Sequence, residues 1–288
     1  MPKKSHPMDV ARTAVSVMGL EDKETTDSSP EANMRKALRI FAKTPTALAA
    51  FYRIRKGKKI IKPKKTLTFA ENFFYMCFGK VPQKEIVKAF DVSLILYAEH
   101  SFNVSTFTAR TITSSLSDIH GAITGAIASL KGPLHGGANE EVMHMMNKIK
   151  KPENALKWIN NALKNKEVVM GFGHRVYKSG DSRVPTMRKY FAKVAKIKKD
   201  KKFEKIYDIV ERVMIKEKNI YPNVDYPTGP TYHLMGFETD FFTPIFVISR
   251  ITGWSAHIME QHAANKLIRP LASYKGNKHR KVMQLNQR

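Results

Sequence analysis

Three loop segments of the sequence combine glycine or proline with an ionisable side chain. GPLHGGAN (132–139) carries His135, GFGHRVYK (171–178) carries His174, and YPNVDYPTG (221–229) carries Asp225. Glycine lets a substrate approach the backbone closely and leaves a neighbouring ring free to point into a cleft. Binding and catalytic residues concentrate on loops that are held by a rigid scaffold. These segments are therefore the first candidates for a site.

Several familiar site chemistries do not fit the sequence. GFGHRV lacks the third glycine of G-x-G-x-x-G, and the chain contains no GK[ST] phosphate loop, no H-E-x-x-H and no paired CxxC. His257 and His262 are five residues apart, so they share a helix face poorly. We expect neither a nucleotide-binding motif nor a metal site.

The composition indicates a soluble globular protein. The chain has 288 residues, of which 42% are hydrophobic, which is enough to fill a core. Its longest uncharged stretches, such as residues 119–130, fall short of the roughly 20 residues that cross a bilayer. The N-terminal MPKKSHPMDV lacks the pattern of a targeting segment. The single cysteine, Cys77, is expected to be buried and inert, and the location is expected to be cytoplasmic.

The formal net charge of +25 favours polyanionic partners. Basic residues concentrate in RIRKGKKIIKPKK (53–65), NKIKK (147–151) and KIKKDKKFEK (196–205), without interleaved aromatic residues that could stack on bases. Solvated helix faces explain these runs, and we expect only weak, sequence-independent binding to nucleic acid. A basic nucleic-acid-binding protein stays as an alternative.

Helix signals recur along the whole chain, so the fold class is expected to be mainly α. Residues 105–130, rich in small side chains, are expected to be central and buried. Thr243 and Pro244 suit the N-cap and the first position of a long helix that carries one unexpected charge, Arg250, which needs a partner. Further helices are expected from Pro7 to Gly19 and over 33–56, 67–79 and 82–98. Pro152 and Pro185 are each expected to start a helix, and an apolar stripe from Phe203 to Met214 predicts another. In the helix from Pro152, the side chains of Leu156, Ile159 and Leu163 are expected to face inward.

The candidate segments resemble one known family. GPLHGGANEEV, GFGHRVYKSGDSR, PNVD and FTPIFVISRITGWSAHIMEQ with LIRPLASY are similar to the citrate synthase family, and the resemblance covers nearly the whole chain. SHPMDVARTAVSVMG, DSRVPTMRKY and YPTGPTYHLMGF look most like its 2-methylcitrate synthases. Family members carry a helical stretch before the point that matches SHPMD, so we expect a chain that is shortened relative to the family.

The resemblance implies a helical fold of two domains. Residues 1–135 and 241–288 would form a large helical domain, and residues 136–240 a smaller domain that closes over CoA. Closure would exclude water while the carbon–carbon bond forms.

The resemblance also implies an acyltransferase reaction. Propionyl-CoA, or alternatively acetyl-CoA, would condense with oxaloacetate, and hydrolysis would give 2-methylcitrate or citrate plus CoA. The acyl-CoA would be a substrate, and no cofactor would be needed. A catalytically inactive scaffold is the alternative of another class.

Each site residue takes its role from the family pattern. Asp225 would be the base, His135 the hydrogen-bond donor to the thioester oxygen, and His174 the donor to the ketone oxygen of oxaloacetate. The carboxylates of oxaloacetate would be held by His100, Arg183, Arg250 and, from the neighbouring subunit of a homodimer, Arg269. Lys178 would lie near the CoA phosphates, with a solvated lysine as the alternative.

Overall fold

The computed structural model describes residues 2–174, 176–177, 179–277 and 280–288. In this part of the chain the regular structure is helical, and the only β-type pairing is an isolated bridge between Phe172 and Pro222. The mainly α class is confirmed. The helices are α1 (Pro7–Glu21), α2 (Pro30–Ile54), α3 (Phe69–Phe78), α4 (Lys84–Tyr97), α5 (Val104–Ser114), α6 (Ile119–Leu130), α7 (Ala138–Ile149), α8 (Pro152–Lys164), α9 (Val184–Ile197), α10 (Lys202–Lys218), α11 (Asp225–Met235) and α12 (Phe242–Ala263), with short 3-10 turns at Thr239–Phe241 and Leu285–Gln287.

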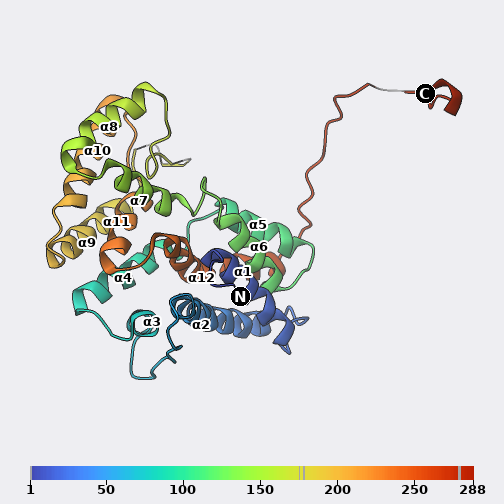
Figure 1. The fold of residues 1–288 in the computed structure, drawn as a ribbon. Helices are drawn as coiled ribbons and strands as arrows, with labels where there is room; N and C mark the ends of the chain where they lie inside the picture. The colour runs from blue at the N-terminus through green and yellow to red at the C-terminus, as the bar shows by residue number, and fades with distance from the viewer. Residues whose placement is uncertain (1, 175, 178, 278–279) are drawn as a thin grey trace.

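The helices gather in two groups along the molecule. Figure 1 shows α7 to α11 together at one end, and α1, α2, α5, α6 and α12 at the other. Helix α12 packs against α2, α5 and α6, and it also meets α4, which in turn packs against α9. The division into residues 1–135 with 241–288 and residues 136–240 stays a prediction.

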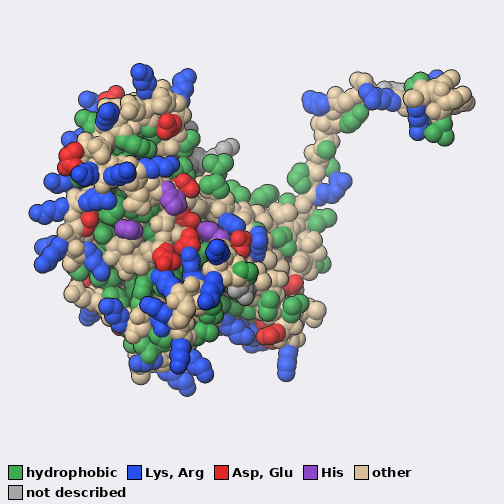
Figure 2. Space-filling model, viewed as in Figure 1, with side chains coloured by type: hydrophobic (Ala, Val, Ile, Leu, Met, Phe, Trp, Pro, Cys, Tyr) green, Lys and Arg blue, Asp and Glu red, His purple; other side chains and the backbone are tan. Residues whose placement is uncertain are grey.

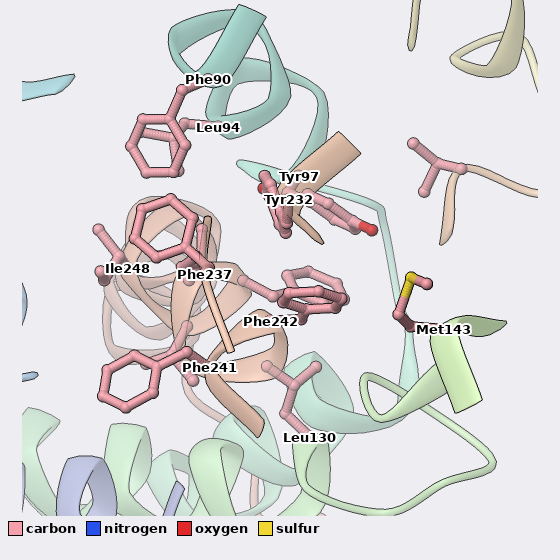
Figure 3. Close-up of a cluster of buried hydrophobic side chains, with 14 of the residues drawn as sticks. Phe90, Leu94, Tyr97, Leu130, Met143, Tyr232, Phe237, Phe241, Phe242 and Ile248 are labelled. Atoms are coloured by element: carbon pink, nitrogen blue, oxygen red, sulfur yellow. The ribbon is translucent and has the colours of Figure 1, made fainter. Parts of the chain in front are cut away.

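An aromatic core joins α4 to α12. Phe90 stacks on Phe73 at 5.6 Å between ring centroids and on Phe237 at 5.8 Å. Figure 3 shows Phe241, the last residue of the 3-10 turn, and Phe242, the first residue of α12, in a cluster with Phe90 and Phe237. Burying such rings contributes roughly 1.5 to 3 kcal/mol each, so the cluster fixes α12 against α4.

Helix ends differ from the expected ones where tertiary contacts decide them. Helix α1 runs through Gly19 to Glu21, because the missing Cβ of Gly19 leaves room for His120, whose own Cβ would lie 3.0 Å from it. Helix α12 begins at Phe242, before Thr243, whose amide donates to the Glu140 carboxylate at 3.2 Å. The expected N-cap at Thr243 is therefore wrong.

Two expected burial patterns also need correction. Leu156 was expected to face inward but is 54% exposed, because α8 buries the small residues Ala155 and Ala162 together with Ile159. The segment 105–130 is two helices. Helix α6 is buried along its apolar residues, whereas α5 exposes half of Phe107.

The basic runs and Cys77 lie where the sequence predicted, the lysines on the surface and the thiol in the core. Every lysine of the three basic runs is exposed, and Figure 2 shows blue side chains spread over the visible surface. Cys77 is a buried free thiol, and burial raises its pKa. Of the helices in the described ranges, none combines the length and apolar character that a bilayer span requires.

Candidate active site

Six of the predicted site residues line one cleft. The cleft has a volume of about 720 Å³ and lies where α4, α7, α11 and α12 meet the two glycine turns. The predicted residues that line it are His100, His135, His174, Arg183, Asp225 and Arg250. Five separate segments of the sequence are thus brought to one place, since His174 and Arg183 share the motif GFGHRVYKSGDSR.

His135 is held by a tight turn and by Ser105. The His135 amide donates to the Gly132 carbonyl at 2.9 Å, and a Cβ on Gly136 would lie 2.4 Å from Leu130, so the turn requires glycine. The backbone N–H of Ser105 donates to Nε2 of His135 at 3.2 Å, and the Ser105 hydroxyl lies 2.8 Å from the same atom. Nε2 is therefore an acceptor, and a neutral ring carries its proton on Nδ1.

The charge state of His135 follows from its surroundings. Burial, and then the positive charge of Arg250, lowers the pKa of His135 to about 4. At neutral pH the ring is an uncharged donor through Nδ1–H. Trp254 supports this arrangement, because its indole N–H donates to the Ser105 hydroxyl at 3.1 Å.

His174 lies in the second glycine turn with its tautomer also fixed. Gly171 and Gly173 take φ values of +84° and +79°, a left-handed conformation that glycine adopts without strain. The amides of Val176 and Tyr177 donate to Nδ1 of His174 at 3.1 and 3.2 Å. Nε2 of a neutral ring therefore carries the proton.

The proton on His174 is directed at His100. The two Nε2 atoms are 2.9 Å apart, so His174 donates and His100 accepts when both rings are neutral. Burial lowers the pKa of His174, and burial followed by the charge of Arg183 lowers the pKa of His100 to about 4. The cleft thus presents uncharged imidazoles.

Two arginines, Arg183 and Arg250, bring positive charge to the cleft. Arg250 is 1% exposed, donates from Nε to the Tyr97 carbonyl at 2.6 Å and lies 4.6 Å from the Phe246 ring centroid. Burial, and then the charge of Arg183, lowers the pKa of Arg250 to about 10. Within the described residues no carboxylate forms an ion pair with Arg250, so the partner expected from the sequence is not on the described chain.

Asp225 begins α11 and faces the same cleft. Its amide donates to Oδ1 of Asn223 at 3.1 Å, and Oδ1 of its carboxylate accepts from the Tyr97 hydroxyl at 2.6 Å. Burial raises the pKa of Asp225 to about 6, against the lowering effects of the Tyr97 hydrogen bond and the charge of Arg183. A carboxylate with such a pKa suits proton abstraction near neutral pH.

Of the predicted site residues that the structure describes, Arg269 lies away from the cleft. Arg269 is exposed in the extended segment after α12 and does not line the cleft. Figure 1 shows this C-terminal segment running away from the helices. Lys178 lies outside the described residues.

Sequence reasoning missed four residues that hold the site together. Tyr97, Ser105, Asp181 and Asn223 each bond to a predicted site residue or to its segment. Asp181 lies two positions before Arg183, and Tyr97 three before His100, so proximity in sequence was the available signal. No group of three or more His, Cys, Asp or Glu side chains is arranged for a metal in the part of the chain that the structure describes.

Solved structures define the class to which this fold and cleft belong. The structure superposes on citrate synthase from Thermotoga maritima with a TM-score of 0.88 and 36% identity, covering 100% of this chain and 76% of that one. It also superposes on Thermoplasma acidophilum citrate synthase, solved in a ternary complex with carboxymethyl coenzyme A and oxaloacetate, with a TM-score of 0.92, 34% identity and coverage of 100% and 77%. The fold is that of the citrate synthases.

Sequence comparison gives the same result in more detail. A family model described as citrate synthase, C-terminal domain, matches residues 1–271. Citrate synthase from Mycolicibacterium smegmatis is 53% identical over 98% of this chain and 76% of its own length. A 2-methylcitrate synthase from Mycobacterium tuberculosis is 53% identical over 97% of this chain and 71% of its own length. The chain belongs to the citrate synthase family.

Proposed function

We propose that this protein is an acyltransferase that condenses an acyl-CoA with oxaloacetate and hydrolyses the product thioester, releasing CoA. The observation that carries the proposal is the cleft itself. A carboxylate with a raised pKa shares it with two neutral histidines whose tautomers each leave one N–H donor. Relatives at 53% identity are named citrate synthase and 2-methylcitrate synthase.

The first step is enolisation of the acyl-CoA. Asp225 takes a proton from the carbon next to the thioester, while Nδ1–H of His135 donates to the thioester oxygen, where negative charge develops. A neutral donor in a buried site stabilises that charge without giving up its proton early. The Tyr97 hydrogen bond holds the carboxylate in place.

The second step is attack on the ketone of oxaloacetate. His174 donates through Nε2–H to the ketone oxygen and protonates the alkoxide as the carbon–carbon bond forms. Nε2–H of His174 donates a hydrogen bond to Nε2 of His100 at 2.9 Å, so the ketone oxygen of oxaloacetate must take the place of His100 as the acceptor. Water then cleaves the thioester.

Two arginines fit the carboxylates of oxaloacetate. Arg250 is buried with one N–H bonded to Tyr97, and a planar guanidinium binds a carboxylate bidentately. Arg183 lies in the same cleft and helps to depress the pKa of both His100 and Arg250 through its charge. A dianionic substrate would supply the carboxylate that Arg250 needs.

The working unit in this proposal is a homodimer in which Arg269 completes the partner's cleft. The exposed, extended segment that carries Arg269 supports this arrangement. The buried free thiol of Cys77 fits the reducing cytoplasm that we propose as the location. The acyl-CoA is a substrate, and the mechanism uses no cofactor.

The acyl group is the finer point. Propionyl-CoA is proposed ahead of acetyl-CoA because three segments of the chain resemble the 2-methylcitrate synthases, although one methylene changes binding in a pocket by only about 1 to 3 kcal/mol.

The proposed reaction is tested by measuring the release of free CoA thiol with each acyl-CoA, with and without oxaloacetate. Release that depends on oxaloacetate supports the proposal. No release with either substrate, together with DNA binding that survives physiological salt, would favour the basic nucleic-acid-binding protein instead.

A further inference from the structure

Asp181 is a buried carboxylate directly behind the cleft. Its side chain is fully buried, and it does not line the cleft. A carboxylate in that position is costly unless it is paired and hydrogen-bonded. Its side chain accepts four hydrogen bonds, which go to two residues.

Three of the four contacts go to Arg183. Asp181 Oδ1 accepts from the backbone N–H of Arg183 at 3.0 Å and from Nε at 2.9 Å, and Oδ2 accepts from Nη2 at 2.7 Å. This bidentate pair occupies one edge of the guanidinium and fixes its plane. The other edge stays available for a ligand, since Nη1 makes only a 3.5 Å contact with the Leu96 carbonyl.

The fourth contact reaches the segment that carries the proposed base. Asp181 Oδ2 accepts from the backbone N–H of Val224 at 3.1 Å, and Val224 directly precedes Asp225. One carboxylate therefore bonds both the proposed oxaloacetate clamp, Arg183, and Val224, the residue directly before α11.

The same two loops are also tied through their backbones. The Gly173 amide donates to the Tyr221 carbonyl at 2.8 Å, and the Asn223 amide donates to the Gly171 carbonyl at 2.9 Å. The Asn223 side chain adds a bond to the Gly173 carbonyl at 3.0 Å. The turn before His174 is thereby joined to the start of α11, and Asp181 adds Arg183 to the same unit.

We propose that Asp181 is a positioning residue that holds Arg183, the start of α11 and thus Asp225 in one rigid arrangement. The inference rests on the proposed function. It predicts that Asp181 acts on oxaloacetate through Arg183 and on proton abstraction through Val224, without touching either substrate.

The test compares two substitutions with a matched control. Asp181→Asn removes the charge, and Asp181→Glu keeps the charge but changes the reach of the carboxylate. The control is Asp208→Asn, which removes the carboxylate from another arginine pair, Arg188 Nη2 to Asp208 Oδ1 at 2.7 Å, on an exposed face of α10. If Asp181→Asn fails to fold, Asp181→Glu alone tests the proposal, because the buried guanidinium of Arg183 keeps a negative partner in that variant.

Steady-state kinetics should separate positioning from a general loss of stability. In both Asp181 variants kcat/KM for oxaloacetate should fall by roughly 10²-fold, the scale of a misplacement of about 1 Å, while KM for the acyl-CoA stays near that of the control. In Asp181→Asn the acid limb of the pH profile should also move to lower pH, because the negative charge of Asp181 raises the pKa of Asp225. Asp181→Glu should leave that limb in place.

Amide hydrogen exchange gives a readout that does not need turnover. Exchange in the segment 221–228 should be faster in both Asp181 variants than in Asp208→Asn. If the wild type shows no oxaloacetate-dependent CoA release, the proposed function fails, and exchange alone judges the link to Val224. The proposed role of Asp181 would be overturned if both variants matched the control in kcat/KM for oxaloacetate and in the exchange rate of residues 221–228.

Discussion

The hydroxyl of Tyr97 donates a hydrogen bond of 2.6 Å to the carboxylate of Asp225, across 128 positions of sequence. Tyr97 is fully buried, and its ring packs on Phe246 with centroids 4.1 Å apart. Burial raises the pKa of Asp225 to about 6, and the Tyr97 bond is the largest effect that opposes the rise. Tyr97 therefore sets how much of the base is ionised near neutral pH.

Replacing Tyr97 with phenylalanine tests that relationship. Because the bond favours the charged carboxylate, Tyr97→Phe should raise the pKa of Asp225 further, by about one unit for a loss of about 1.4 kcal/mol. The acid limb of kcat/KM should move to higher pH while activity recovers in mild alkali. A limb that stays in place or moves toward acid would contradict the account.

Replacing the base should separate activity from stability. Asp225→Asn is expected to lower turnover by roughly 10² to 10⁴-fold, the usual contribution of a general base. Oxaloacetate binding, followed by calorimetry, should persist. Turnover close to that of the wild type would remove Asp225 from the mechanism.

The same variant should gain stability at neutral and alkaline pH. The folded pKa of about 6 lies above the ordinary value of 3.8, so the folded state binds the proton more tightly than the unfolded chain does. The stability that this proton contributes below about pH 4 is lost as the pH rises through about 6. Asp225→Asn avoids that loss, so its free energy of unfolding should exceed that of the wild type by about 3 kcal/mol at pH 8, a gain that fades at pH 4. Thermal unfolding at both pH values measures it.

Gly253 marks the crossing of α12 with the end of α4. Its amide donates to the Ala98 carbonyl at 3.0 Å, and a Cβ there would lie 2.5 Å from that oxygen. Gly253→Ala should cost about 1 to 3 kcal/mol of stability, as overpacking does, and should weaken oxaloacetate binding by moving His100 away from Arg250. The control is Gly121→Ala in α6, where the nearest contact is the Ser117 hydroxyl at 3.2 Å. Equal behaviour of the two variants would contradict the crossing argument.

Arg269 is proposed to act in the partner's cleft, and subunit mixing tests this. Asp225→Asn and Arg269→Ala proteins should each be inactive alone. After subunit exchange half the dimers are mixed, and about a quarter of all sites then combine an intact Asp225 with an intact Arg269. Partial recovery of activity is therefore expected.

Exchange must be shown separately, with mass-tagged subunits. Verified exchange without any recovery would place Arg269 outside a shared site.

The sequence predicted the helices well where local chemistry decides them. Pro7 and Pro152 begin helices as expected, because proline is preorganised for the first helical position. The helix expected over 67–79 is α3, which the structure shows to start with a capping box of Thr68 and Glu71. The end of α1 was wrong because Gly19 is kept for packing against His120, a contact made 101 positions away. Leu156 was misplaced because alanines, which carry little pattern, form the buried stripe of α8.

The site shows the same limit. Family motifs brought His135, His174 and Asp225 to attention, but their protonation depends on Ser105, on the amides after His174 and on Tyr97. None of these partners follows from spacing, because each depends on how separate helices meet. Arg250 could be predicted to need a partner, and only the fold shows that the described chain supplies a carbonyl in place of a carboxylate.

If the cleft joins the acyl carbon to oxaloacetate, the mass of the product shows the new carbon–carbon bond. The purified protein would be incubated with isotope-labelled propionyl-CoA and oxaloacetate, and the products resolved by mass spectrometry beside Asp225→Asn. Labelled 2-methylcitrate and free CoA should form in equal amounts, with little of either from Asp225→Asn. Labelled free propionate with CoA, and no tricarboxylate, would contradict it.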